Sequence, residues 1–245
     1  MASISETDFV DALKFGVQRT RNLIGRLTDY HGGAVKTEYL ITADIAREFI
    51  ERGYETRVEC LNRHMVNAMT ELNGAARKNL HSKRTDIAII QDGIIPLAII
   101  EVKIRANKFS RVQQDLNKIT STMSMMQAKF ASKVIGASVF EMHIPGSRKR
   151  FSVEQLKEAA LKIESTFETQ LQNYALEKPD FAFSMKPLQP PESGIIGREI
   201  ESVGGQLAWS QDGHATRYHV ILIRSTRPIP APPKNITELR KVGGR

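Results

Sequence analysis

Cysteine is nearly absent from the sequence: Cys60 is the only one among 245 residues. A single cysteine excludes an intramolecular disulfide and a cysteine-rich zinc site, and it suits a reducing compartment. Long apolar runs are also missing, because the longest, residues 94–100, falls far short of the roughly 20 residues of a membrane span. The N-terminal stretch MASISETDFV has two acidic side chains and no apolar core, unlike a secretory signal. We therefore expect a soluble cytoplasmic protein with no membrane partner.

Aromatic residues make up only 7% of the chain and are not interleaved with basic ones, so a stacking platform for single strands is not indicated. Basic residues outnumber acidic ones, which gives the chain a net charge of +8 and a pI near 9.6. Such a balance favours association with nucleic acid, although an ordinary soluble basic protein would have the same composition. The basic residues form small clusters at 77–84, 147–150 and 239–245. Charge alone thus indicates a polyanion without specifying which.

Hydrophobic periodicity separates helices from strands along the chain. Helices are expected at about 5–27, 37–52, 110–130 and 152–175. Two helix starts are marked by side chains, since Ser110 is an N-cap candidate and Ser152 with Gln155 forms a capping box. Strands are expected at 54–61, on both sides of Asp92-Gly93, and at 133–142, 181–185, 206–210 and 216–225. Residues 62–83 show no clear pattern, and the proline-rich stretch 226–235 is expected to form an extended tail.

This order of elements predicts an α/β fold with a mixed central sheet flanked by helices. We divide the chain into four segments: an N-terminal helical segment (1–33), a core (34–145), a C-terminal α/β extension of helix and strands packed on the core (146–226), and a proline-rich basic tail (227–245). The residues that suggest chemistry all fall in the second segment.

An apolar hairpin in this core is bracketed by charges. Asp86 precedes the first of its two strands, and Glu101 and Lys103 close the second. Burying an unpaired charge costs several kcal/mol, so these groups need an explanation. Glu101 and Lys103 project to one face because they are two residues apart on a strand. A two-residue turn at Asp92-Gly93 would place Asp86 opposite Ile99 and diagonal to Glu101, unless a bulge at Pro96 shifts the register.

Two acidic side chains this close repel each other, and a divalent cation between them would remove the conflict. Oxygen ligands without a histidine or cysteine partner indicate Mg²⁺, with Mn²⁺ as a substitute. Such an ion polarises a phosphodiester and acidifies a bound water. The Lys103 ammonium would position that water and offset charge on the phosphate. Asp92 is excluded from this site because the turn itself accounts for it.

Asp86, fourteen intervening residues (87–100) and then Glu101-Val102-Lys103 resemble the signature of the PD-(D/E)XK nuclease superfamily. The resemblance covers about residues 35–142 and implies a restriction-endonuclease-like core with Asp86, Glu101 and Lys103 as catalytic residues. It implies a glutamate from a preceding helix as well, and Glu38 is the candidate. The implied metal ligands are Asp86, Glu101, Glu38 and the backbone carbonyl of Val102.

The chain departs from the family pattern at two positions. Thr85 stands where the family name has proline, and Asn117 stands where some exonuclease-like branches have the tyrosine of Gln-X-X-X-Tyr. Gln113 and Gln114 therefore remain only as candidate substrate contacts. Each piece also has a simpler explanation: Glu38 could complement the positive end of its helix, Asp86 could cap a turn, and Glu-X-Lys arises often by chance.

Together these features predict a Mg²⁺-dependent phosphodiesterase, most simply a DNA endonuclease of the restriction or defence type. An RNase, a nickase or a structure-selective nuclease would use the same residues, and a catalytically silent basic module that only binds nucleic acid remains an alternative. DNA is favoured over RNA as the partner, and a homodimer is compatible with the sequence. The expected nucleic-acid contacts flank the two catalytic strands: Lys83, Arg84, Arg105, Lys108, Gln113 and Gln114.

Overall fold

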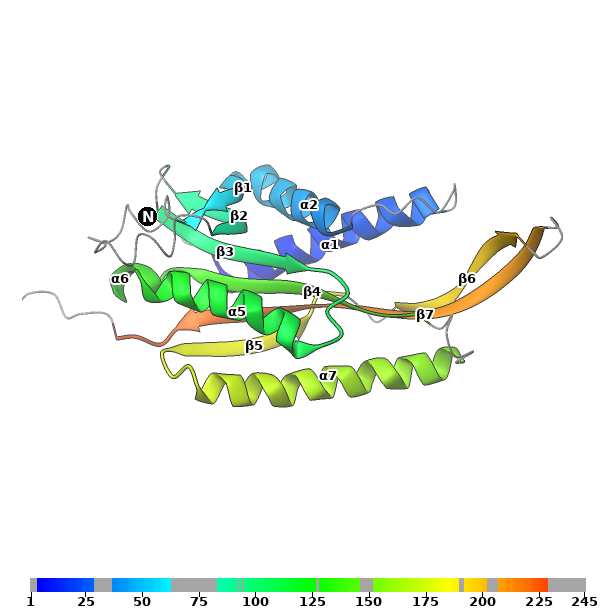
Figure 1. The fold of residues 1–245 in the computed structure, drawn as a ribbon. Coiled ribbons are helices and arrows are strands. Elements are labelled where there is room, and N and C mark those ends of the chain that lie inside the picture. Colours follow the sequence, from blue (N-terminus) through cyan, green and yellow to red (C-terminus); the bar gives the residue numbers. More distant parts are fainter. Residues whose placement is uncertain are drawn as a thin grey trace, which may run out of the picture.

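A computed structural model describes residues 4–28, 37–62, 83–91, 93, 95–126, 128–145, 152–189, 192–201 and 207–228. These residues form three layers, with one sheet between two groups of helices (Figure 1). The predicted α/β class, with a mixed sheet flanked by helices, is therefore confirmed.

The sheet has seven strands, six of which follow the order β1-β2-β3-β4-β7-β5. Their bounds are β1 Glu55–Leu61, β2 Arg84–Gln91, β3 Ile95–Lys103, β4 Ile135–Pro145, β5 Phe181–Pro187, β6 Glu192–Glu201 and β7 Leu207–Ser225. The β3–β4 pair is parallel and the other described pairs are antiparallel. A parallel pair needs a crossover connection, which contains helix α5 (Phe109–Ser124). Strand β6 pairs with the first half of β7, and these two strands form an arm that extends beyond the sheet (Figure 1).

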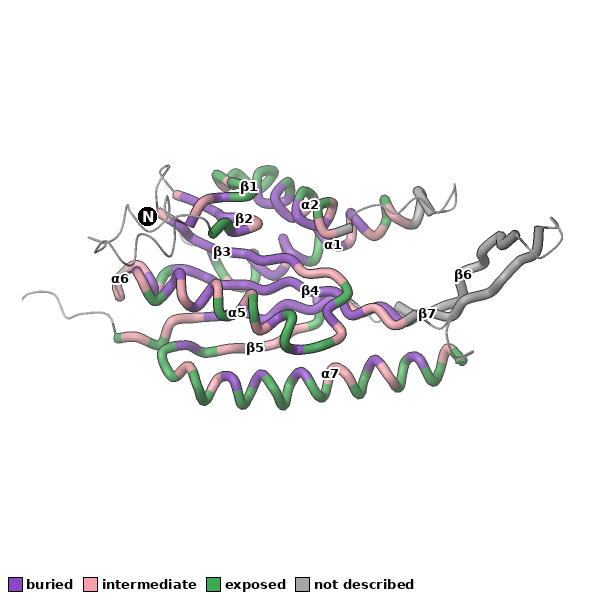
Figure 2. The backbone as a smooth tube through the Cα atoms, in the orientation of Figure 1, coloured by how far each residue is buried: buried purple, intermediate pink, exposed green. Residues whose placement is uncertain are grey.

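Helices cover both faces of the sheet. Helices α1 (Glu6–Thr28) and α2 (Thr37–Glu51) share one hydrophobic core with the sheet, while α5 and α7 (Val153–Leu176) share the other. The short helix α6 (Ala128–Ala131) follows α5. Strands β2 and β3 contribute to both cores and are buried along most of their length, as predicted for strands covered on both faces (Figure 2). The end of β3 therefore lies between two layers of helices.

Two glycines set how closely the helices approach. A Cβ on Gly16 of α1 would lie 2.6 Å from the Ile45 Cα of α2. A Cβ on Gly136 of β4 would lie 2.5 Å from the Ile119 side chain of α5. A larger residue at Gly136 would force the Ile119 side chain, or α5 with it, to shift. This matters for function because α5 carries two charged side chains toward the end of β3.

The local predictions are partly confirmed. Ser152 and Gln155 form the predicted capping box at the start of α7. The prediction that Ser110 caps α5 is wrong, because the helix already begins at Phe109 and its N-cap, Lys108, makes no side-chain capping bond. The separate strands predicted at 206–210 and 216–225 are wrong as well. They form one strand, β7, because residues 211–215 pair with β6 instead of turning.

The segments 34–145 and 146–226 contribute to a single sheet, since β7 lies between β4 and β5. Helix α1, from the predicted N-terminal segment, packs on α2 in the same core as β2 and β3. The basic clusters at 147–150 and 239–245, most of the cluster at 77–84 and the tail beyond 228 lie outside the described residues. Among the helices described, none is both long and apolar enough to cross a membrane.

Candidate active site

The hairpin that carries the predicted site has a different register from the predicted one. Gln91 pairs with Ile95, so three residues connect the strands, and Gly93 has a φ of 75° that favours glycine. A bulge between Ile89 and Ile90 then shifts the pairing by one more residue. This bulge lies beside Pro96, which has no N–H to donate to the ladder.

The two shifts change which residue lies level with Asp86. Ile87 pairs with Ile100, so Asp86 comes level with Glu101. The predicted position opposite Ile99 is therefore wrong, although Asp86 and Glu101 still come together. Beyond this point the Asp86 Oδ2 atom accepts a hydrogen bond from the Val102 N–H at 2.7 Å. The carboxylate thus lies between β2 and β3, where the ladder ends, and burial raises the pKa of Asp86 although this hydrogen bond opposes the change.

Glu101 is the most deeply buried acid of the site, with 2% of its surface exposed. Its Oε2 atom accepts a hydrogen bond from the Lys118 ammonium of α5 at 2.6 Å, while its Oε1 atom is buried without a hydrogen-bond partner. Burial, followed by the charge of Asp86, raises the pKa of Glu101 to about 8 although Lys118 opposes the change. A buried carboxylate oxygen without a donor is costly and favours a bound proton or cation.

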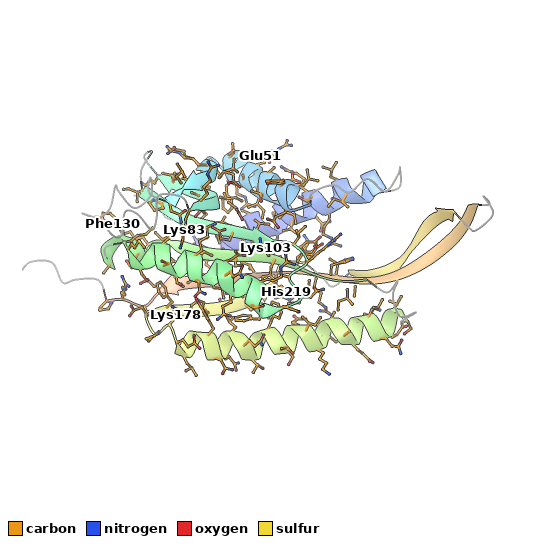
Figure 3. All side chains as sticks on the ribbon, in the orientation of Figure 1. Glu51, Lys83, Lys103, Phe130, Lys178 and His219 are labelled. Atoms are coloured by element: carbon orange, nitrogen blue, oxygen red, sulfur yellow. The ribbon has the colours of Figure 1, made fainter. Side chains whose placement is uncertain are left out.

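Glu38 and Lys103 meet at the same end of β3. The Lys103 ammonium, on the side chain labelled in Figure 3, lies 3.7 Å from the Glu38 Oε1 atom. The backbone N–H of Ile104 donates to Glu38 Oε2 at 3.5 Å. Helix α2 therefore brings Glu38 to the sheet from the face opposite α5. The pair is partly exposed, with 27% of the Lys103 and 38% of the Glu38 side chain accessible, so it contributes little to stability.

Helix α5 supplies two charged residues that the sequence reasoning missed. Lys118 pairs with Glu101, and the Oδ2 atom of Asp115 is buried without a hydrogen-bond partner. Burial raises the pKa of Asp115 to about 6, with Lys103 lowering it and Asp86 raising it. Asp115 thus belongs to the same electrostatic cluster as the predicted residues. Its position at the margin of an apolar helix stripe was a usable signal, because the same signal singled out Glu38.

A buried chain of hydrogen bonds ties α5 to the start of β2. The Thr85 hydroxyl donates to Asn62 Oδ1 at 2.8 Å, and Asn62 Nδ2 donates to Thr122 Oγ1 at 3.0 Å. Thr122 in turn donates to the backbone carbonyl of Lys118 at 2.9 Å. Thr85 stands where the signature that the sequence resembles has proline. Its hydroxyl gives it a structural role there, which is to fix the turn of α5 that carries Lys118.

The predicted nucleic-acid contacts lie on the segments that flank this cluster. Lys83 and Arg84 are exposed at the start of β2, and Arg84 lies 3.9 Å from Glu59. Arg105 and Lys108 are exposed between β3 and α5. On α5, the exposed Gln114 is one turn before Lys118, whereas helical spacing places Gln113 well away from that side of the helix.

Comparison of the chain with protein-family models, with curated proteins and with solved structures finds no match. In the part of the chain that the structure describes, no group of three or more His, Cys, Asp or Glu side chains is arranged to hold a metal ion. The functional evidence is therefore the arrangement of charged side chains at the end of β3. It consists of the buried Glu101 beside the half-buried Asp86, the half-buried Asp115 on α5, and two lysines among them.

Proposed function

We propose that the chain is a metal-dependent nuclease of the PD-(D/E)XK type, most simply a DNA endonuclease. The observation that carries the proposal is the Glu101 carboxylate, which is buried at the end of β3 beside Asp86 with one oxygen lacking any partner. A fold built only for stability gains nothing from a buried acid beside a half-buried one, because each raises the free energy of ionising the other. A site that binds a cation has a reason to keep both.

The residues present fit a small, hard cation such as Mg²⁺ or Mn²⁺. The donors are all oxygen atoms: the carboxylates of Asp86 and Glu101, with the Val102 carbonyl and Glu38 as the further ligands that the family resemblance implies. In the described structure the Glu38 carboxylate lies 3.7 Å from the Lys103 ammonium. Mg²⁺ is commonly held by one or two carboxylates together with water and substrate phosphate oxygens. The lack of a three-acid cage among the described residues is thus compatible with this ion. When bound, the ion would supply an acidified water and a polarised phosphodiester.

The remaining side chains have complementary roles in hydrolysis. Lys103 is partly exposed at the strand end, where its ammonium can orient the attacking water and offset charge on the phosphate. Glu38 lies 3.7 Å from that ammonium and provides a counter-charge. The attacking water would lose a proton as its oxygen bonds to phosphorus, one P–O ester bond would break, and the leaving alkoxide would take up a proton. An RNase, nickase or structure-selective nuclease would use the same arrangement.

One observation favours a second candidate. Lys118 already provides Glu101 with a counter-charge at 2.6 Å, so the buried acid has a cation without any metal. A basic protein with this ion pair could bind nucleic acid without cleaving it. The two candidates differ in their response to a chelator. A metal-dependent nuclease loses its cleavage activity in EDTA, whereas a protein that only binds nucleic acid shows no cleavage with or without the metal.

The decisive experiment is a substrate panel. Purified protein is incubated with supercoiled plasmid, linear duplex, single-stranded DNA and RNA, each with Mg²⁺ or with EDTA. Cleavage of DNA that disappears with EDTA supports the endonuclease, and cleavage restricted to RNA supports the RNase. Binding of the same substrates without cleavage in Mg²⁺ or Mn²⁺ would support the silent module and contradict the proposal.

A further inference from the structure

The ion pair between Lys118 and Glu101 joins two different elements of the site. Lys118 lies on α5 and Glu101 on β3, and only 3% of the Glu101 side chain and 25% of the Lys118 side chain are exposed. A carboxylate this deeply buried is costly to ionise without a cation beside it. Lys118 is therefore the internal counter-cation of Glu101 in the described structure.

A divalent cation at Glu101 would have to compete with this ammonium. The ammonium contacts Glu101 Oε2, and the other oxygen, Oε1, faces no donor. Two cations held on one carboxylate repel each other, and the repulsion is strong where water is excluded. The lysine would therefore lower the affinity for the metal as long as it stays on Glu101.

Asp115 offers Lys118 a second partner. It lies three residues earlier on α5, a spacing that places the two side chains next to each other on the helix surface. Its Oδ2 atom is buried without a hydrogen-bond partner, so an ammonium that leaves Glu101 would meet an acceptor that is otherwise unsatisfied. The long lysine side chain can make this change by rotation alone.

The helix itself is held in place while the side chain moves. The Lys118 carbonyl accepts the Thr122 hydroxyl, and Thr122 is joined to β2 through Asn62 and Thr85. All three of these side chains are buried. The backbone of Lys118 is thus fixed relative to β2, and the freedom of the site is in the side chain.

We propose that Lys118 is a positioning residue that occupies the place of the metal at Glu101 and moves to Asp115 when a divalent cation binds. This inference rests on the proposed function, because it requires a metal at Glu101. It assigns Asp115 a role as the second partner of the lysine rather than as a metal ligand. A protein with this device keeps its buried acids neutralised between catalytic cycles.

The test is a double-mutant cycle on Mg²⁺ affinity, measured by isothermal titration calorimetry at pH 8.5 without substrate. Lys118→Met should bind Mg²⁺ about tenfold more tightly than the wild type, because it removes a competing cation. Asp115→Asn should bind severalfold more weakly, because the lysine loses its second partner. In the Lys118→Met background, Asp115→Asn should weaken binding by much less than it does in the wild type, because only the loss of a nearby negative charge remains. Lys157→Met, on the exposed face of α7, is the matched loss of one positive charge and should leave the affinity unchanged.

Each result decides between the alternatives. Equal or weaker Mg²⁺ binding by Lys118→Met overturns the proposal, and a loss from Asp115→Asn that is equally large with and without Lys118 also overturns it, because Asp115 would then act on the metal independently of the lysine. If neither the wild type nor Lys118→Met binds Mg²⁺ or Mn²⁺, the proposed metal-dependent function itself fails. Circular dichroism and a melting curve check the fold. If Lys118→Met does not fold, Lys118→Gln repeats the test, because it removes the charge but keeps a hydrogen-bond donor.

Discussion

At the scale of single residues, Glu101 is the acid of the site whose ionisation costs the most free energy, because it is the most deeply buried. It shares its surroundings with Asp86 and Asp115, and the Lys118 ammonium contacts its carboxylate. Each of these three acids has a raised pKa with burial as the largest cause. The folded protein therefore takes up protons that an unfolded chain would release, which makes stability depend on pH.

Glu101→Gln should change that dependence in the metal-free protein. The pKa of Glu101 is about 8 in the folded state against 4.5 ordinarily, so its contribution to stability is fully present below pH 4.5 and is lost as pH rises through 8. Urea unfolding in EDTA at pH 5 and pH 9 should show a smaller decline for the variant, with the difference on the order of a few kcal/mol. Asp86 and Asp115 are present in both proteins, so the difference reports the loss of Glu101 together with its interactions with these two acids. An equal fall in unfolding free energy between pH 5 and pH 9 in both proteins would contradict the raised pKa of Glu101.

At the scale of elements, the site depends on how β2, β3 and α5 are fixed to one another. The β2–β3 ladder ends where the Asp86 carboxylate accepts the Val102 N–H, and the Thr85–Asn62–Thr122 chain joins the start of β2 to α5. Gly136 lets α5 approach the sheet closely. These contacts determine where Lys118 and Asp115 lie relative to Glu101.

Thr85→Val should test the buried chain. Valine keeps the shape but removes the hydroxyl, which leaves the buried Asn62 Oδ1 without its donor and should cost about 1–3 kcal/mol of unfolding free energy. Thr166→Val is the matched control, because the Thr166 hydroxyl bonds to a backbone carbonyl on the exposed side of α7. The control should change the urea midpoint by much less. Equal effects of the two substitutions would show that the buried chain has no special role.

The sequence predicted most elements because their signals are local. Periodicity located α1 and α2, and the capping box located the start of α7. The hairpin register could not be predicted, since it depends on a three-residue connection and on a bulge at Ile89–Ile90 that Pro96 only hints at. Strand β6 was missed because its pairing with β7 is a tertiary contact. The Lys118–Glu101 pair was missed for the same reason, because it crosses from a helix to a strand.

At the scale of the whole molecule, the layers bring the charged groups to one end of β3. Helix α2 supplies Glu38 from one face of the sheet, and α5 supplies Asp115 and Lys118 from the other. The net charge of +8 supplies a field that attracts a polyanion. Binding of nucleic acid and cleavage are then separable properties, since the basic groups and the buried acids are different residues.

The basic groups that flank the site should dominate nucleic-acid binding. In a Glu101→Ala background, substituting four of them with glutamine (Lys83, Arg84, Arg105 and Lys108) should flatten the dependence of the logarithm of affinity on the logarithm of salt. The slope should change by roughly 0.9 for each duplex phosphate that the variant no longer neutralises. The matched control replaces four of the five basic residues of the tail with glutamine and spares Arg227, which pairs with Asp180: Lys234, Arg240, Lys241 and Arg245. Fluorescence anisotropy across a salt series compares them, and a flatter slope for the tail variant alone would place the substrate elsewhere.

The proposal that this chain is a metal-dependent nuclease is tested best by one comparison: Mg²⁺-dependent cleavage of supercoiled plasmid by the wild type and by Glu101→Gln. Glu158→Gln, at an exposed position of α7, is purified in parallel to control for contaminating nucleases and for the loss of one carboxylate. We expect wild-type and Glu158→Gln cleavage to be equal and to vanish in EDTA, and Glu101→Gln to be slower by at least about a hundredfold. Cleavage by Glu101→Gln at the wild-type rate, or no cleavage by any of the three proteins, would contradict the assignment.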